Sequence, residues 1–143
     1  MLFDVNSLSE YVPQISFLAT LLGYMDTTEH TFREFDTETN FYSGGIGSDL
    51  NIYSLYNSED VELKFDVKTK TLAGRIKDTV RLMAEMMFKT VFTDEKHLRE
   101  VVAETRSRLK VRLMSAGHQA AVSYSMAGIT VDGWYNDYSM GIG

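Results

Sequence analysis

The chain has 143 residues, of which 44% are hydrophobic and 24% are charged, so it can bury a core and does not have the composition of a disordered protein. Its formal net charge of −6 argues against nucleic acid as a partner, because a phosphate-binding surface requires a basic patch. It has no cysteine, which excludes disulfides, thiolate catalysis and cysteine-bound zinc and is compatible with a cytoplasmic location, and neither a signal peptide nor a membrane-spanning run is visible.

The first expected helix lies near the N-terminus. Ser7-x-x-Glu10 has the spacing of a capping box, although Pro13 predicts that the main helix begins close to that proline. Gly23 is a natural stop. Apolar residues at helical spacing predict one buried face, formed by Leu8, Tyr11, Val12, Ile15, Leu18, Ala19 and Leu22.

A second, shorter helix follows. Thr31-x-x-Glu34 is another candidate capping box, and the helix that it opens would place Phe35 and Tyr42 on one side. Gly44 or Gly45 is expected to end this helix, because glycine adopts the left-handed cap conformation without steric cost.

From Ile46 the apolar period changes from helical to two. One alternating run contains Ile46, Leu50, Ile52 and Tyr56, the second contains Val61, Leu63, Phe65 and Val67, and residues 57–60 between them read as a turn. Lysine and acidic residues alternate with the second apolar set. The pattern predicts an antiparallel hairpin with one apolar face and one solvated face.

Two further helices are expected after the hairpin. The first would bury Ile76, Val80, Met83, Met87 and Val91. The second would be capped by Thr93, would pair Glu104 with Arg108, and would bury Leu98, Val101, Val102, Thr105, Leu109 and Leu113. Gly117 interrupts this helix, a turn or two follow, and residues 129–143 read as a loop or tail.

The predicted fold class is α+β, with helices covering one face of an antiparallel sheet. Residues 1–143 are interpreted as one domain. Because two strands alone are only marginally stable, the domain is expected to be incomplete, and unpaired sheet edges would favour self-association.

The three histidines are the first candidates for chemistry. His97-x-x-Glu100 is not a zinc motif, because Val101 stands where an inverted motif needs a second imidazole, so a polar turn on an exposed helix face is favoured. His118 could bind a ligand, but capping carbonyls or filling a polar niche is favoured. His30 is expected in solvent. Separated histidines without cysteine do not predict a zinc site.

The remaining candidates also have structural explanations. Met83, Met86, Met87, Met114 and Met126 could form an adaptable groove, but their spacing favours core. The glycines at 44–47 run from helix into strand, opposite to a phosphate loop. Trp134, Tyr135 and Tyr138 could dock on a neighbouring domain or cover the core, with docking slightly favoured. No carboxylates are marked as a catalytic pair, and the acidic residues read as solvated helix faces: Glu34, Asp36, Glu38, Asp94, Glu95, Glu100 and Glu104.

Short segments over nearly the whole chain share one resemblance. They are Phe3-Asp4, Tyr11-Val12-Pro13, Leu21-Leu22-Gly23, Tyr42-Ser43-Gly44-Gly45-Ile46, Glu104-x-Arg106-Ser107-x-Leu109 and Ala116-Gly117-His118. These segments resemble the pitrilysin/insulinase group of zinc metallopeptidases, with the presequence-protease branch the most similar.

The resemblance implies a non-catalytic fragment with a pitrilysin-like fold. Enzymes of the group have four similar α+β domains in two halves that close as a clamshell around a peptide, and zinc is held by His-x-x-Glu-His in the first domain. This chain resembles the third domain, the first of the C-terminal half. Its equivalent helix passes through Gln14, Phe17 and Leu18, which offer no imidazole or carboxylate.

No catalytic, cofactor-binding or metal-binding residue is therefore assigned to this chain, and zinc is expected only in the parent enzyme. The expected partners are the other domains of the parent and, in the full-length enzyme, its peptide substrate. The resemblance also implies that Leu2-Phe3 is the tail of a strand. Two rivals stay open: a non-enzymatic assembly subunit of the same fold, and a small-molecule-binding domain.

Overall fold

The computed structural model describes residues 1–54, 61–115, 117–129 and 133–134 and has the expected α+β class. Its three strands form one antiparallel sheet in the order β1-β3-β2. The strands are β1 (Leu2–Asp4), β2 (Ser43–Ser54) and β3 (Val61–Thr71). The helices are α1 (Val12–Leu21), α2 (Phe32–Tyr42), α3 (Ile76–Phe88), α4 (Glu95–Ser115) and α5 (Gly117–Ala127), with 3-10 turns η1 (Asn6–Tyr11) and η2 (Ala73–Arg75).

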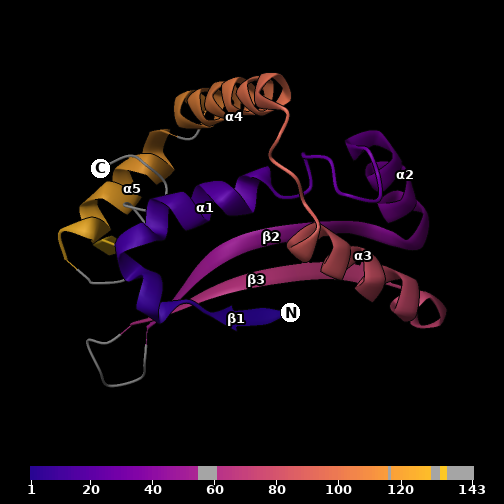
Figure 1. Cartoon of the computed structure of the whole chain (residues 1–143). Coiled ribbons are helices and arrows are strands. Elements are labelled where there is room, and N and C mark those ends of the chain that lie inside the picture. The colour runs from indigo at the N-terminus through magenta and orange to yellow at the C-terminus, as the bar shows by residue number, and fades with distance from the viewer. Residues whose placement is uncertain (55–60, 116, 130–132, 135–143) are drawn as a thin grey trace.

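The sheet has one apolar and one solvated face, as the alternation predicts. Leu63, Phe65 and Val67 of the central strand β3 are buried, and α1, α2 and α3 pack over that side (Figure 1). On the opposite side Lys68 Nζ lies 2.6 Å from Asp49 Oδ2, across the β2–β3 pair. Residues 55–60, which include the predicted turn and Tyr56, lie outside the described residues.

Strand β1 confirms the expectation drawn from the family resemblance for Leu2-Phe3. Phe3 pairs with Phe65 in an antiparallel register, and the Met1 carbonyl accepts a hydrogen bond from the Val67 N–H. Periodicity could not reveal this strand, because three residues are too few to show an alternating pattern.

The start of α1 follows Pro13, whereas the capping box at Ser7-x-x-Glu10 is wrong. Residues 6–11 form η1, and no side chain caps either η1 or α1. A 3-10 turn has three residues per turn, so the apolar stripe does not continue through it. Leu8 and Tyr11 are consequently exposed, as is Leu18 farther along, while Val12, Ile15, Ala19 and Leu22 are buried as predicted.

The start of α2 is predicted correctly, but its end is not. Thr31 and Glu34 form the reciprocal capping box, with the Thr31 N–H donating to Glu34 Oε2 at 2.9 Å. No left-handed glycine closes the helix. Ser43 is already extended, and Gly45, at φ +103°, lies within β2 where the register with β3 shifts at a bulge.

The buried face of α3 is rotated from the predicted stripe. Ile76 and Val80 are exposed, whereas Met83 is buried as expected. Two polar side chains, Thr79 and Glu85, take buried positions because each has hydrogen-bond partners inside. The complete buried set is Thr79, Leu82, Met83, Glu85 and Met86.

Helix α4 is capped by Asp94 rather than Thr93, because Asp94 Oδ1 accepts the His97 N–H at 3.0 Å. Only Val101 and Thr105 of its predicted stripe are buried; Leu98 is partly buried, and Val102 and Leu109 are exposed. The Leu113 side chain lies outside the described residues.

Helices α4 and α5 lie away from the sheet, with α4 above α1 (Figure 1). A small second cluster of Leu21, Met25 and Val101 joins α4 to the body. Met114 and Met126, expected in the core, are exposed. Most of 129–143, including Tyr135 and Tyr138, lies outside the described residues, and Trp134 is half exposed.

Candidate functional site

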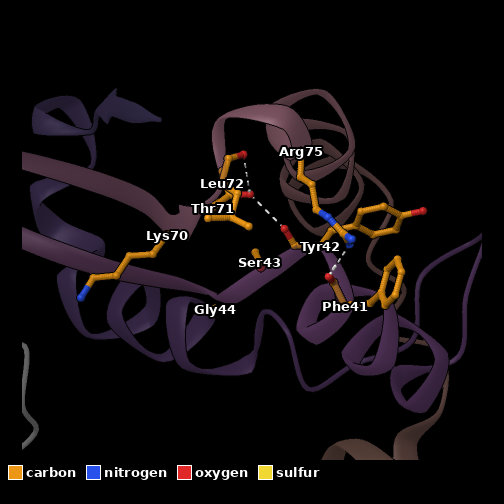
Figure 2. Close-up of a pocket in the computed structure, with 8 residues that line it drawn as sticks. All are labelled: Phe41, Tyr42, Ser43, Gly44, Lys70, Thr71, Leu72 and Arg75. Atoms are coloured by element: carbon orange, nitrogen blue, oxygen red, sulfur yellow. Dashed lines mark hydrogen bonds between the residues drawn. The ribbon is translucent and has the colours of Figure 1, made fainter.

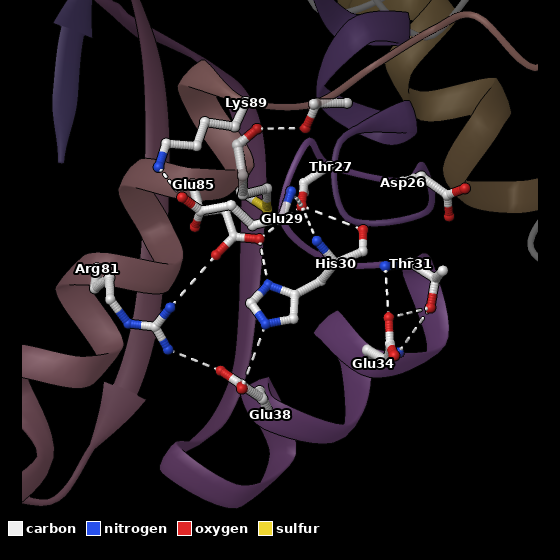
Figure 3. A network of polar contacts seen from close by, with 12 residues as sticks. Asp26, Thr27, Glu29, His30, Thr31, Glu34, Glu38, Arg81, Glu85 and Lys89 are labelled. Carbon is white, nitrogen blue, oxygen red and sulfur yellow. Dashed lines mark hydrogen bonds and ion pairs between the residues drawn. The ribbon is translucent and has the colours of Figure 1, made fainter.

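A buried carboxylate on α3 is the centre of the most elaborate polar network in the described structure. Glu85 is only 1% exposed. Its Oε1 accepts the Thr27 hydroxyl at 2.6 Å and lies 2.7 Å from His30 Nδ1 (Figure 3). Its other oxygen, Oε2, accepts no hydrogen bond from the described residues and lies 3.6 Å from Arg81 Nη1.

The loop between α1 and α2 presents Thr27 and His30 to this carboxylate. Gly23 starts the loop at φ +87°, a conformation that favours glycine. The Thr28 N–H then donates to the Lys89 carbonyl at 2.9 Å, and the Val91 N–H donates to the Asp26 carbonyl at 2.9 Å. These backbone bonds fix the loop against the segment that follows α3.

His30 is therefore not in solvent, and that expectation is wrong. The hydrogen bond to Glu85 raises the pKa of the imidazole above its usual value, and the charges of Glu85 and Glu38 act in the same direction against partial burial and Arg81. The reason for the error is that its partner lies 55 residues away on α3, beyond any local pattern.

Glu29, His30 and Glu85 bring possible metal-ligand atoms within 4.8 Å of one another. Cationic side chains already surround these acids, however. Lys89 pairs with Glu29, and Arg81 Nη2 lies 2.8 Å from Glu38 Oε2. A divalent cation would have to displace an ammonium group from Glu29 and a proton from His30. The arrangement thus favours an ion network that fixes the loop over a metal centre.

A separate pocket of about 450 Å³ lies where α2, β2, β3 and η2 meet (Figure 2). The Arg75 guanidinium lies 4.4 Å from the centre of the Phe41 ring and donates to the Phe41 carbonyl at 2.7 Å. Thr71 Oγ1 donates to the Tyr42 carbonyl at 2.9 Å. Since these groups satisfy one another, the pocket joins four chain segments and shows no convergent catalytic set.

The other predicted candidates are dispersed. His97 is not a purely exposed polar turn, because its Nε2 lies 2.8 Å from the Tyr24 carbonyl and so links α4 to the loop. His118 is exposed at the start of α5. Arg108 pairs with Glu104 as predicted, at 3.9 Å, and also donates to the Tyr24 hydroxyl at 3.0 Å.

The helix α1 offers no metal ligand on its exposed face. Gln14, Phe17 and Leu18 are all exposed there. Sequence reasoning missed Glu85, Tyr24 and Arg75. The signal for Glu85 was its position within the helical stripe that Leu82, Met83 and Met86 define, where a carboxylate requires a buried partner.

Comparison with known proteins relates the whole chain to a peptidase-associated region. A family model for the region associated with M-class peptidases of subfamily 16C matches residues 1–143. Presequence protease 1, chloroplastic/mitochondrial, from Arabidopsis thaliana is 27% identical over 143 residues, which is 99% of this chain and 13% of that protein. Protein HypA from Clostridium perfringens is 22% identical over 142 residues, 98% of this chain and 15% of that protein.

A third relative is the mitochondrial presequence protease of Drosophila melanogaster, 26% identical over 131 residues, which is 90% of this chain and 12% of that protein. The chain thus spans between about an eighth and a seventh of the length of these relatives. The matches confirm the resemblance to the presequence-protease branch.

Proposed function

Because the chain belongs to the family associated with M-class peptidases of subfamily 16C, we propose that it is a non-catalytic part of the C-terminal half of a zinc-dependent peptidase that degrades peptides inside a clamshell chamber. The family match over residues 1–143 is the observation that carries the proposal. The relatives named as presequence proteases are far longer, so the remainder of the parent would supply zinc and the catalytic groups.

The chemistry of α1 supports a structural role. In the family resemblance this helix is equivalent to the one that carries the zinc motif, yet none of its ten residues is a histidine, aspartate or glutamate. Zinc in proteins is bound by imidazole, thiolate or carboxylate. The helix therefore does not fit a zinc site, and its packing on β2 and α4 makes it part of the wall of the domain.

The test compares the parent polypeptide with the isolated chain. After dialysis, zinc is measured by plasma mass spectrometry, and cleavage is followed with a fluorogenic peptide. We expect zinc and turnover from the parent and neither from the chain. A parent lacking residues 1–143 should keep its zinc, lose turnover, and regain turnover when the chain is added. Stoichiometric zinc or turnover from the chain alone would overturn the proposal.

The alternative, a non-enzymatic assembly subunit of the same fold, predicts a different result for the parent. Such a parent would lack the zinc motif throughout and would show neither zinc nor turnover. The uninformative name of the Clostridium relative favours neither role.

The compartment is also a proposal. Absence of cysteine suits the cytoplasm, whereas two relatives carry names that place them in mitochondria or chloroplasts. Fractionation of cells that express the tagged parent would decide. None of the described helices combines the length and apolar character that membrane crossing requires.

A further inference from the structure

Helix α4 is attached to the body over only the first half of its length. Val101 and Thr105 are its buried residues, and Leu98 packs beside them. Every described side chain from residue 106 to 115 is exposed. A helix of 21 residues is about 30 Å long, so much of its surface is open for contact.

A groove of about 650 Å³ runs along one side of α4. Leu98, Val102 and Ala103 supply apolar surface, and the longer side chains of Arg99, Arg106 and Lys110 line it as well. These positions recur three or four residues apart, so they form one stripe over about four turns. Such an elongated stripe suits a helix laid along it, with apolar anchors of its own at matching intervals.

The charge along the groove is the reverse of the charge of the body. Residues 106–112 contain four Arg or Lys and no acid, whereas residues 1–94 contain fifteen Asp or Glu and eight Arg or Lys. Glu95 is already paired with Arg99 at 2.7 Å. No described residue forms an ion pair with Arg106 or Lys110. An occupant should therefore carry carboxylates beside its apolar face.

We propose that this groove on α4 receives an acidic amphipathic helix from the remainder of the parent polypeptide, which lies outside these 143 residues. The proposal rests on the proposed function for the existence of that remainder, since the chain covers only 12 to 15% of its relatives. A second copy of the chain is a poorer occupant. Its acidic amphipathic helix, α2, already buries Phe35 in its own core.

The test titrates the chain into a fluorescein-labelled 18-residue Leu/Glu peptide of amphipathic helical pattern and follows anisotropy. Two further peptides serve as references, one with the same composition scrambled and one with Lys in place of Glu. We expect saturable binding of the amphipathic acidic peptide, at least tenfold tighter than either reference. The double variant Arg106→Glu/Lys110→Glu should weaken that binding at least tenfold, and Val102→Asp should also weaken it.

The matched control is Lys77→Glu/Lys96→Glu, which changes the net charge equally at exposed positions that do not line the groove. It should change affinity by less than twofold, and circular dichroism should show the native spectrum for every variant. Equal binding of the scrambled peptide, preference for the Lys peptide, or dimerisation of the chain through this face would each overturn the proposal.

The groove and the peptidase assignment fail separately. In the full-length parent, Arg106→Glu/Lys110→Glu should accelerate hydrogen exchange of α4 amides, whether or not the parent holds zinc. A parent without zinc or turnover removes the peptidase assignment only. Unchanged exchange in an active parent removes the groove only.

Discussion

A single buried carboxylate organises the loop between α1 and α2. Glu85 has lost its hydration, and an unpaired buried charge costs several kcal/mol. The Thr27 hydroxyl and the His30 imidazole compensate by binding the same oxygen. His30 therefore contributes to stability through its proton rather than through catalysis.

The first prediction concerns pH and His30. Its pKa is raised in the folded state above the unfolded value of 6.5. Its contribution is therefore complete below pH 6.5 and is lost as pH rises through the folded-state pKa. His30→Gln should lower the free energy of unfolding by about 3 kcal/mol at pH 6 and should flatten the decline in stability between pH 6 and 9. Urea unfolding at several pH values measures both.

The control for that prediction is His118→Gln, since His118 is exposed on α5. This variant should retain the stability and the pH dependence of the unaltered chain. A His30→Gln variant that keeps the original pH dependence would show that His30 is not the titrating group.

The second prediction concerns the bulge in β2. Gly45 has φ +103°, where a side chain is strained, while Gly47 lies in the same strand with open space around a built Cβ. Gly45→Ala should cost about 1 to 2 kcal/mol of unfolding free energy. Gly47→Ala should cost less than about 0.5 kcal/mol. Thermal unfolding of the two variants compares them, and equal costs would contradict the bulge assignment.

At the level of elements, α2, β2, β3 and α3 meet around one hydroxyl. Thr79 is fully buried on α3, and its Oγ1 lies 2.9 Å from Thr71 Oγ1 and 3.3 Å from the Tyr42 carbonyl. The hydroxyl thus connects the end of α2 with the end of β3. This contact holds the junction where the Arg75 pocket lies (Figure 2).

The third prediction tests that junction. Thr79→Val keeps the shape but removes the hydroxyl, which leaves buried oxygens with fewer donors, so it should cost about 1 to 3 kcal/mol. Thr37→Val is the matched control, because Thr37 is exposed on α2 and donates only to the Arg33 carbonyl of its own helix. It should stay within about 0.5 kcal/mol in denaturant unfolding. Similar losses from both variants would sink the idea.

The elements that sequence reasoning found are those determined by near neighbours. The Thr31–Glu34 capping box and the alternation of β3 depend on residues within a few positions, so their patterns are readable. The rotation of α3 was missed because periodicity counts only apolar residues. It gives no weight to Thr79 or Glu85, whose partners make burial possible.

The candidate site was less accessible for the same reason. The His30–Glu85 contact joins residues 55 positions apart, and no single-sequence pattern connects a loop histidine with one particular carboxylate. The absence of a zinc-motif helix, by contrast, could be read directly, because that motif is local.

The whole molecule consists of a main core under the sheet and a smaller cluster that holds α4. The main core draws on α1, α2, α3 and β3, whereas Val101 is the one buried α4 residue among the three that define the smaller cluster. Few contacts fasten α4, so local opening of this helix should cost less than global unfolding.

The fourth prediction follows from that difference. Val101→Ala should speed hydrogen exchange of α4 amides by at least tenfold, since the lost packing is about 2 kcal/mol. Amides of β3 should change less. Val102→Ala is the control, because Val102 is adjacent but exposed. Exchange measured by mass spectrometry should leave that variant unchanged throughout. Equal acceleration in α4 and β3 would mean that the molecule opens as one unit.

The pairing of β1 with β3 has a consequence during synthesis on the ribosome. Leu2 must wait for Asp66, 64 positions later in the register, which is roughly 3 to 13 s at ordinary translation speed. Throughout that delay Phe3 has no strand beside it. The nascent N-terminal segment is thus a natural client for a holding chaperone until the centre of the sheet emerges.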